Sequence, residues 1–217
     1  MTPHWPIYLI TDRRQVGGHG LVPTVDAALR GGIRAIQLRE KDLPLPLLLA
    51  LARELRELTA RAEASLVING RIDVMLAVGA DGVHLRSDGL PTRAVRRVIG
   101  PRKVLGVSTH SMAEAQRAED EGADFVTFGP VYETPSKAGY GRPVGLAALD
   151  AVCRRVRVPV YALGGISRAR IRETLGAGAY GVAMISEIMS AGDSFAAARA
   201  CVDVVRDATR DHSVDHR

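Results

Sequence analysis

Gly32-Ile-Arg-Ala-Ile36 is followed along the chain by three stretches of the same design, Gly79-Ala-Asp-Gly-Val83, Gly122-Ala-Asp-Phe-Val126 and Gly178-Ala-Tyr-Gly-Val182. In each, a helix-like run ends at glycine and a strand-like apolar run follows. Glycine closes a helix at low cost because it accepts the left-handed backbone conformation. The intervals of 47, 43 and 56 residues each hold about two βα units, which leaves room for eight strands. The spacing therefore predicts a single (β/α)8 TIM barrel, whose functional residues lie at the carboxyl ends of the strands.

The 217-residue chain has the length of one barrel, and we predict a single domain over residues 1–210 with a frayed polar tail at 211–217. Apolar residues make up 47% of the chain and charged residues 24%, a balance typical of soluble globular proteins. Apolar runs are too short to span a membrane, and the first residues lack the features of a signal peptide. A cytoplasmic location without a membrane partner is therefore expected.

The formal net charge of +5 indicates anionic partners. Nucleic acid is not expected, because aromatic residues are only 4% of the chain and the basic residues are spread around predicted helices. Cys153 and Cys201 fall in predicted helices without metal-ligand spacing, so we interpret them as small buried side chains. The composition favours a protein that handles anionic small molecules, and it leaves homo-oligomerisation open.

Short apolar runs predict eight strands, and longer amphipathic runs between them predict helices. Two helices have recognisable starts, with Pro46 ahead of one and a capping-box pair, Ser111 and Glu114, at another. The predicted strands are Ile7–Thr11, Ala35–Arg39, Leu66–Asn69, Gly82–Leu85, Val104–Ser108, Phe125–Gly129, Val158–Leu163 and Gly181–Ile185. The clearest predicted helices are Leu47–Ala62, Met112–Glu121, Leu146–Val156 and Phe195–Ala208.

Alternation along these strands separates apolar from polar side chains. The apolar set is expected to face the helices, so the polar set points into the barrel. Burying such groups costs a few kcal/mol each unless they find partners, and barrel interiors are usually filled with branched apolar residues. We therefore interpret the inward polar set as part of a functional site: Gln37, Arg39, Asn69, His84, Arg86 and Ser108.

Two groups of residues at predicted strand ends suit anions. Gly164-Gly165 ends the seventh strand, and Ile185-Ser186 leads from the eighth strand into a short helical stretch, where exposed backbone N–H groups form an anion pocket. Cations and hydroxyls gather elsewhere on the barrel mouth, as a phosphate or diphosphate would require. This second group comprises Arg39, Lys41, Thr134, Ser136 and Lys137.

Six fragments, in order and at strand ends, resemble those of the thiamin phosphate synthase and TenI family over nearly the whole chain. They are Ile7-Tyr-Leu-Ile-Thr-Asp-Arg13, Gln37-Leu-Arg-Glu-Lys41, Gly79-Ala-Asp-Gly-Val-His-Leu85, Gly106-Val-Ser-Thr-His110, Gly129-Pro-Val-Tyr-Glu-Thr-Pro-Ser-Lys137 and Ala162-Leu-Gly-Gly-Ile166. The resemblance implies a (β/α)8 enzyme of thiamin biosynthesis.

The synthase of this family joins hydroxymethylpyrimidine diphosphate to hydroxyethylthiazole phosphate and releases diphosphate. By resemblance, the thiazole phosphate is expected at Gly164, Gly165, Ile185 and Ser186. The pyrimidine diphosphate is expected at Arg39, Lys41, Asn69, Ser108, Thr134, Ser136 and Lys137.

One departure concerns Mg²⁺, which two aspartates hold in the synthase motif. Gly70 and Gly89 occupy those positions here, which leaves Asp88 as a weak candidate ligand after a one-residue shift. Arg86 would instead supply positive charge directly to a phosphate. Because a lost metal site is hard to replace, we expect a TenI-type thiazole tautomerase that needs no cofactor and moves a proton to aromatise a thiazole carboxylate phosphate.

The tautomerase interpretation has its own departure, because Pro130 stands where TenI proteins carry an acid–base histidine. Three other residues are candidates for that role: His110, Glu133 and His84. Two alternatives remain open. The first is an active thiamin phosphate synthase that uses Mg²⁺, and the second is a non-catalytic protein that binds thiazole phosphate or thiamin phosphate.

Overall fold

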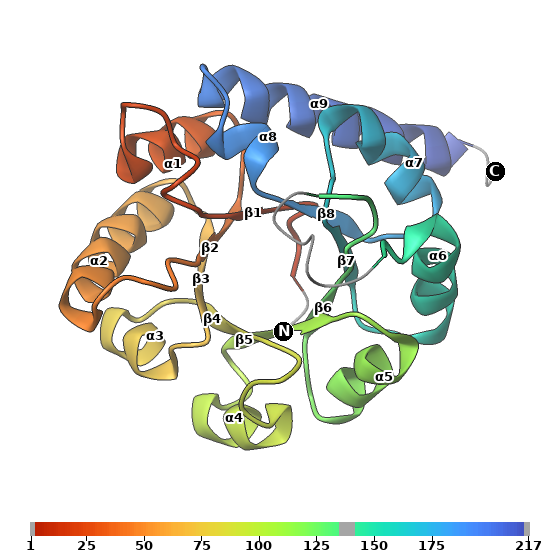
Figure 1. Ribbon diagram of the computed structural model, residues 1–217, viewed down its shortest axis with the longest axis horizontal. Coiled ribbons are helices and arrows are strands. Elements are labelled where there is room, and N and C mark those ends of the chain that lie inside the picture. The colour runs from red at the N-terminus through yellow and green to blue at the C-terminus, as the bar shows by residue number, and fades with distance from the viewer. Residues whose placement is uncertain (1–2, 135–141, 215–217) are drawn as a thin grey trace.

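The computed structural model describes residues 3–134 and 142–214, with side chains up to residue 210. Eight parallel strands close into a barrel in sequence order, which confirms the predicted (β/α)8 fold (Figure 1). The strands are β1 (Ile7–Ile10), β2 (Ala35–Leu38), β3 (Ser65–Asn69), β4 (Gly82–Leu85), β5 (Val104–Thr109), β6 (Phe125–Phe128), β7 (Val160–Leu163) and β8 (Gly181–Met184).

Helices surround the barrel, and α9 lies across α1 and α7 (Figure 1). The α-helices are α1 (Leu21–Arg30), α2 (Leu45–Arg61), α3 (Ile72–Val78), α4 (Thr92–Ile99), α5 (Met112–Asp120), α6 (Gly145–Arg155), α7 (Ile171–Gly176), α8 (Ser186–Met189) and α9 (Ser194–Val214). A 3₁₀ turn, η2 (Arg168–Arg170), precedes α7. Among the described residues, no helix has the length and apolar character needed to cross a membrane.

The repeated glycines occupy the joints before the even-numbered strands. Gly32, Gly79, Gly122 and Gly178 all have positive φ, at 107°, 64°, 94° and 84°, and lie ahead of β2, β4, β6 and β8. This is the conformation that glycine adopts most easily, so the repeat sets the period of the fold.

Two of these joints also carry an aspartate that binds the neighbouring strand. Asp124 Oδ2 accepts from the backbone N–H of Leu105 at 2.8 Å and pairs with Arg96, while Asp81 Oδ2 accepts from Leu66 N at 2.8 Å and from Arg56 at 2.8 Å.

The predicted element boundaries hold to within a few residues. The predicted N-cap is present, because Ser111 Oγ accepts from Glu114 N at 3.2 Å, while the Glu114 carboxylate accepts from the backbone N–H of His110 at 2.7 Å. Two differences have a clear physical cause. β7 starts at Val160 rather than Val158, after Pro159, which has no N–H to donate. α9 continues to Val214, past the predicted start of the frayed tail at residue 211, because the sequence there has no Gly or Pro to end it. Residues 215–217 lie outside the described residues.

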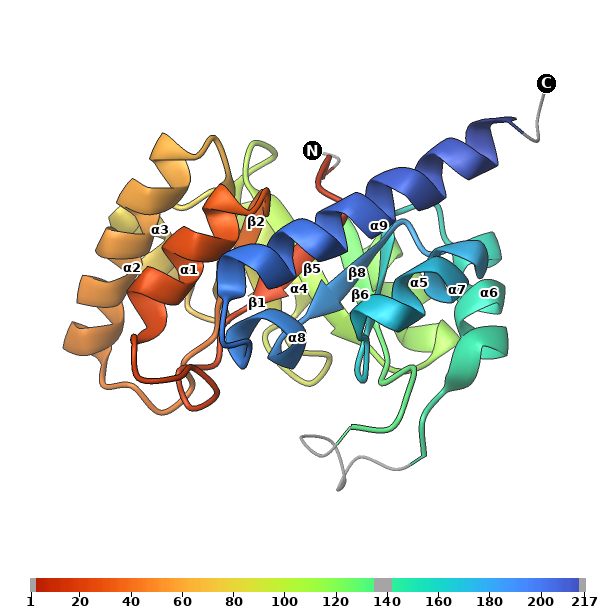
Figure 2. The same ribbon diagram turned by 90° about the horizontal axis from the view of Figure 1, so that it is seen from above.

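Two apolar cores separate as strand alternation predicts. The larger one packs the outward faces of the strands, including Ile36, Leu66 and Val83, against the helices. The smaller one fills the barrel interior with an aromatic group, in which the Trp5 ring lies 5.0 Å from Tyr8, 5.3 Å from Phe125 and 5.1 Å from Tyr161 between centroids. The chain enters at this end of the barrel, on the opposite side from the loop that joins β1 to α1 (Figure 2). The other end of the interior, at the carboxyl ends of the strands, is polar and holds the candidate site.

Candidate active site

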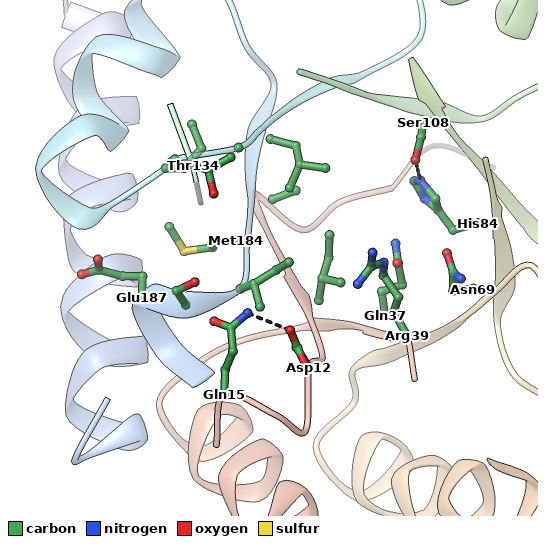
Figure 3. Close-up of a pocket in the computed structure, with 18 of the residues that line it drawn as sticks. Asp12, Gln15, Gln37, Arg39, Asn69, His84, Ser108, Thr134, Met184 and Glu187 are labelled. Carbon is green, nitrogen blue, oxygen red and sulfur yellow. Dashed lines mark hydrogen bonds between the residues drawn. The ribbon is translucent and has the colours of Figure 1, made fainter. Parts of the chain in front are cut away.

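A cavity of about 560 Å³ opens at the carboxyl ends of the strands, and it collects the predicted site residues (Figure 3). Every predicted site residue that the structure describes lines it: Gln37, Arg39, Lys41, Asn69, His84, Arg86, Asp88, Ser108, His110, Glu133, Thr134, Gly164, Gly165, Ile185 and Ser186. Ser136 and Lys137 lie outside the described residues.

The cavity also has lining residues that the sequence analysis missed. Asp12 and Gln15 follow β1, and Gln15 Nε2 donates to Asp12 Oδ2 at 2.7 Å. Ser87 lines it from the loop after β4, Arg170 from η2 and Glu187 from α8. Asp12 belongs to one of the family fragments and follows a strand, so the strand-end rule could have found it. Arg170 carries no such signal, because the turn of η2 brings it back to the mouth.

One wall of the cavity is built by β2, β3 and their loops. The register of these strands pairs Leu38 with Ile68, so Arg39 and Asn69 leave their strands at the same level (Figure 3). Lys41 and Arg86 also line the cavity. Positive charge and amide groups at one level form a wall suited to phosphate oxygens.

A buried carboxylate fixes the backbone of this wall. Glu40 accepts from Thr11 Oγ1 at 2.8 Å and from Arg13 N at 3.1 and 3.2 Å, and it pairs with Arg13 Nη1 at 3.1 Å. Thr11 Oγ1 in turn accepts from Arg39 N at 2.9 Å. The loops after β1 and β2 are therefore joined at the base of Arg39, which sets the direction in which this side chain leaves the strand.

The facing wall is made of backbone. Gly164 and Gly165 have φ of 97° and 66°, and a Cβ on Gly165 would lie 2.6 Å from Glu133 O and 2.7 Å from Tyr132 Cβ. Only glycine fits so close to the loop after β6. Arg170 Nη1 donates to Gly165 O at 2.7 Å and its guanidinium lies 4.3 Å from the centre of the Tyr132 ring. Met184 and Glu187 lie on this side, across the cavity from Gln37, Arg39 and Asn69 (Figure 3).

The donor set at the ends of β3 and β4 does not fit Mg²⁺. Both carboxylate oxygens of Asp88 accept from Arg86, at 2.9 and 2.7 Å, and those hydrogen bonds hold the Asp88 pKa below its usual value. Asp73 is paired in the same way with Arg71. Across the described parts of the chain, no three His, Cys, Asp or Glu side chains come together as a metal-binding group. Mg²⁺ prefers several free oxygen ligands, which this wall does not offer.

The two histidines of the cavity have different environments. His84 is buried, and burial followed by the positive charge of Arg39 lowers its pKa to about 3, so the imidazole is neutral at physiological pH. His110 lies at the rim, where Nδ1 is 3.2 Å from Glu114 Oε2 and 3.4 Å from Ser87 Oγ. Of the predicted acid–base candidates, His110 is the one that combines a carboxylate partner with access to the cavity.

The fold and the cavity together define a (β/α)8-barrel protein whose mouth carries cations on one wall and a glycine-rich backbone on the other. The chain belongs to the thiamine monophosphate synthase family, whose model matches residues 7–188. This confirms the family resemblance and makes the chain a member of an enzyme family of thiamin biosynthesis.

Named relatives cover almost the full length. A Geobacter sulfurreducens protein with a thiamine-phosphate synthase name is 52% identical over 94% of this chain and 96% of its own. The thiamine-phosphate synthase of Roseiflexus castenholzii is 47% identical over 91% and 87% of the two chains. The solved thiamine phosphate pyrophosphorylase of Pyrococcus furiosus superposes with a TM-score of 0.86 at 36% identity, covering 94% and 96%. These names favour the synthase alternative over the tautomerase that we expected from the sequence.

Proposed function

We propose that this protein is a thiamin phosphate synthase, a transferase that joins hydroxymethylpyrimidine diphosphate to hydroxyethylthiazole phosphate. In the reaction, the thiazole nitrogen forms a bond to the pyrimidine methylene carbon. The bond from that carbon to the diphosphate oxygen breaks, and diphosphate leaves. The observation that carries the proposal is the presence of two anion-suited walls facing each other in one cavity, because the reaction needs a diphosphate and a phosphate held on either side of the reacting atoms.

In this proposal, each wall binds a different substrate. Arg39, Lys41 and Arg86 bind the diphosphate, with Asn69 and Ser108 as neutral hydrogen-bonding groups. The backbone at Gly164, Gly165, Ile185 and Ser186 binds the thiazole phosphate. Gln37 lies nearly fully buried on the floor, where the pyrimidine ring would rest between the two anions.

Diphosphate departure requires that negative charge developing on the leaving oxygen be stabilised. Side-chain cations on the β2–β4 wall meet this requirement in the proposal. Gly70 and Gly89 are the departures from the family motif on this wall, and Arg86 brings a permanent charge close to the positions from which the motif holds a metal ion. Family members use Mg²⁺ for this purpose, but the carboxylate positions at Gly70 and Gly89 are vacant of side chains, so no step is assigned to a metal here.

A thiazole tautomerase is the second candidate. It is favoured by the side chains at the ends of β3 and β4, which do not fit Mg²⁺. That reaction needs an acid–base group rather than a metal, and His110 with Glu114 forms a pair that could hold and move a proton at the cavity rim. Glu133 is exposed at the rim and lies close to the glycine wall through its backbone. The relatives' names give the synthase priority.

The deciding experiment is a mass-spectrometric assay of the purified protein with two substrate sets, each with Mg²⁺ and with EDTA. The first set is thiazole phosphate with pyrimidine diphosphate, and the second is the non-aromatic thiazole carboxylate phosphate. Formation of thiamin phosphate supports the synthase. Aromatisation above the buffer rate, lost in His110→Asn, identifies the tautomerase instead. Tight binding of thiazole phosphate without turnover of either set identifies a non-catalytic binding protein.

A further inference from the structure

A row of hydrogen-bonding side chains forms the cavity floor, between the aromatic core and Ser108. Gln37 Nε2 donates to Tyr8 Oη at 2.9 Å, and Tyr8 Oη lies 3.5 Å from His84 Nδ1. His84 Nε2 lies 3.0 Å from Ser108 Oγ, the contact drawn in Figure 3. Thr127 Oγ1 approaches the same Ser108 oxygen at 3.5 Å. The row runs from the interior of the barrel to a hydroxyl that lines the cavity.

Burial makes the direction of these hydrogen bonds decidable. Tyr8 is fully buried, and burial raises its pKa, so it keeps its proton. Its oxygen accepts from Gln37, and the acceptor that the structure gives for its own hydrogen is His84 Nδ1. A buried hydroxyl without an acceptor is costly, so Nδ1 is the unprotonated nitrogen of the neutral imidazole.

The proton of His84 is therefore on Nε2, which donates to Ser108 Oγ. Thr127 adds a second, longer donor to that oxygen. A serine oxygen has two acceptor lone pairs. One accepts from His84 below, and the other faces Thr127, which pairs with Ser108 at the same level on the neighbouring strand. The hydrogen of Ser108 is thus directed away from the floor and into the cavity, where it meets the substrate.

We propose that Tyr8 and His84 are positioning residues, which act through Ser108 by holding its hydroxyl as a hydrogen-bond donor toward the diphosphate-bearing substrate. The inference rests on the proposed synthase function, because it names the substrate that accepts the bond. An oxygen of the diphosphate gains negative charge as the carbon–oxygen bond breaks, so a fixed donor stabilises that change more than one that must first reorient.

A double-mutant cycle tests whether Tyr8 acts through Ser108. Ser108→Ala is expected to lower kcat about tenfold to a hundredfold, and Tyr8→Phe about threefold to tenfold, since Ser108 can then turn to donate to His84. The KM for thiazole phosphate is expected to stay unchanged in both, because that substrate lies on the other wall. The double variant is expected to match Ser108→Ala alone.

Tyr161→Phe is the matched control. Tyr161 is a second buried tyrosine of the same interior core, but its hydroxyl donates to Trp5 O at 2.7 Å and takes no part in the row. This variant loses one buried hydrogen bond of similar type and is expected to keep the wild-type kcat. Multiplying effects in the double variant, or an equal loss in Tyr161→Phe, would overturn the proposal.

A second measurement is independent of turnover. In ¹⁵N-labelled protein, long-range ¹H–¹⁵N spectra distinguish the two histidine tautomers, and the His84 signals are identified by their loss in His84→Gln. The expected result is an Nε2-protonated, neutral His84, with a change in the tautomer pattern in Tyr8→Phe. A proton on Nδ1 would contradict the positioning role. Absence of thiamin phosphate formation with the expected tautomer would instead refute the proposed function and remove the substrate named for Ser108.

Discussion

Arg86 and Asp88 form a two-bonded ion pair at the cavity rim, with Nε to Oδ1 at 2.9 Å and Nη2 to Oδ2 at 2.7 Å. The pair occupies the loop after β4, where the family motif places a metal-binding carboxylate. Asp88 therefore orients a cation rather than offering free oxygens to one. The side chains are 55% and 66% exposed, so solvent screens the pair and its role lies in the site more than in stability.

Removal of the Arg86 charge is expected to damage catalysis more than removal of its partner. Arg86→Gln should lower kcat/KM for the pyrimidine diphosphate about tenfold to a hundredfold, because a charge-assisted bond to the diphosphate is lost. Asp88→Asn keeps the Arg86 charge and should change kcat/KM for the pyrimidine diphosphate less than about threefold. Steady-state kinetics at two salt concentrations measure this. A larger loss in Asp88→Asn would indicate that the carboxylate holds a metal ion.

Substitution at Gly165 is expected to damage the thiazole phosphate side. A side chain there meets the backbone of the loop after β6 and adopts a left-handed conformation that costs about 1–2 kcal/mol. Gly165→Ala should weaken binding of thiazole phosphate more than about tenfold, as measured by calorimetry. Gly176→Ala is the matched control, since a Cβ there meets nothing within 4 Å. Equal affinity in Gly165→Ala and wild type would remove this wall from the site.

His84 is expected to give the fold an acid-sensitive component. Its pKa falls from 6.5 to about 3 on folding, so between these values the unfolded chain binds a proton that the native protein does not. Stability from this group is present above pH 6.5 and is lost as the pH falls. The free energy of unfolding should therefore drop by about 2 kcal/mol from pH 7 to pH 5 through this residue.

Urea titrations of wild type and His84→Gln at both pH values isolate this contribution, because the other titrating groups are common to the two proteins. The variant should be the less pH-dependent of the two. An equal change in the free energy of unfolding with pH in both proteins would mean that His84 is already protonated, or solvated, in the native state.

Asp124 is expected to contribute to stability because it serves both a buried backbone N–H and Arg96. Asp124→Asn should lower the free energy of unfolding by about 3 kcal/mol, since a mostly buried guanidinium loses its charged partner. Asp150→Asn removes an exposed pair with Arg154 on α6 and should cause no measurable change. Urea unfolding of the two variants compares them. Similar small losses would show that solvent reaches the Arg96–Asp124 pair.

The barrel and most of the mouth could be predicted because both follow from local rules. Glycines that must adopt positive φ marked every second joint, and the two-residue period of strands placed Gln37, Asn69 and His84 inside. The glycine pair at the end of the seventh predicted strand then indicated the backbone wall at Gly164 and Gly165, and the family fragments agreed with it.

Other features depend on packing between distant segments. The depth of His84 is set by its contacts with Tyr8 and Phe125, so its neutral state could not be inferred from an inward-pointing histidine alone. Arg170 reaches the mouth through a turn and a cation–π contact with Tyr132, neither of which has a sequence period. The pairing that takes Asp88 away from a metal role likewise depends on side-chain geometry rather than on sequence spacing.

The aromatic core around Trp5 gives the barrel a closed base, with Tyr8, Phe125 and Tyr161 packed across the interior. Substrates then enter and products then leave the proposed site through the same opening, at the mouth of the barrel. Diphosphate and thiamin phosphate must clear the opening that the next pair of substrates needs. Each product would then compete with the incoming substrate for the wall that its parent substrate occupied, so product inhibition is the expected consequence of the closed base.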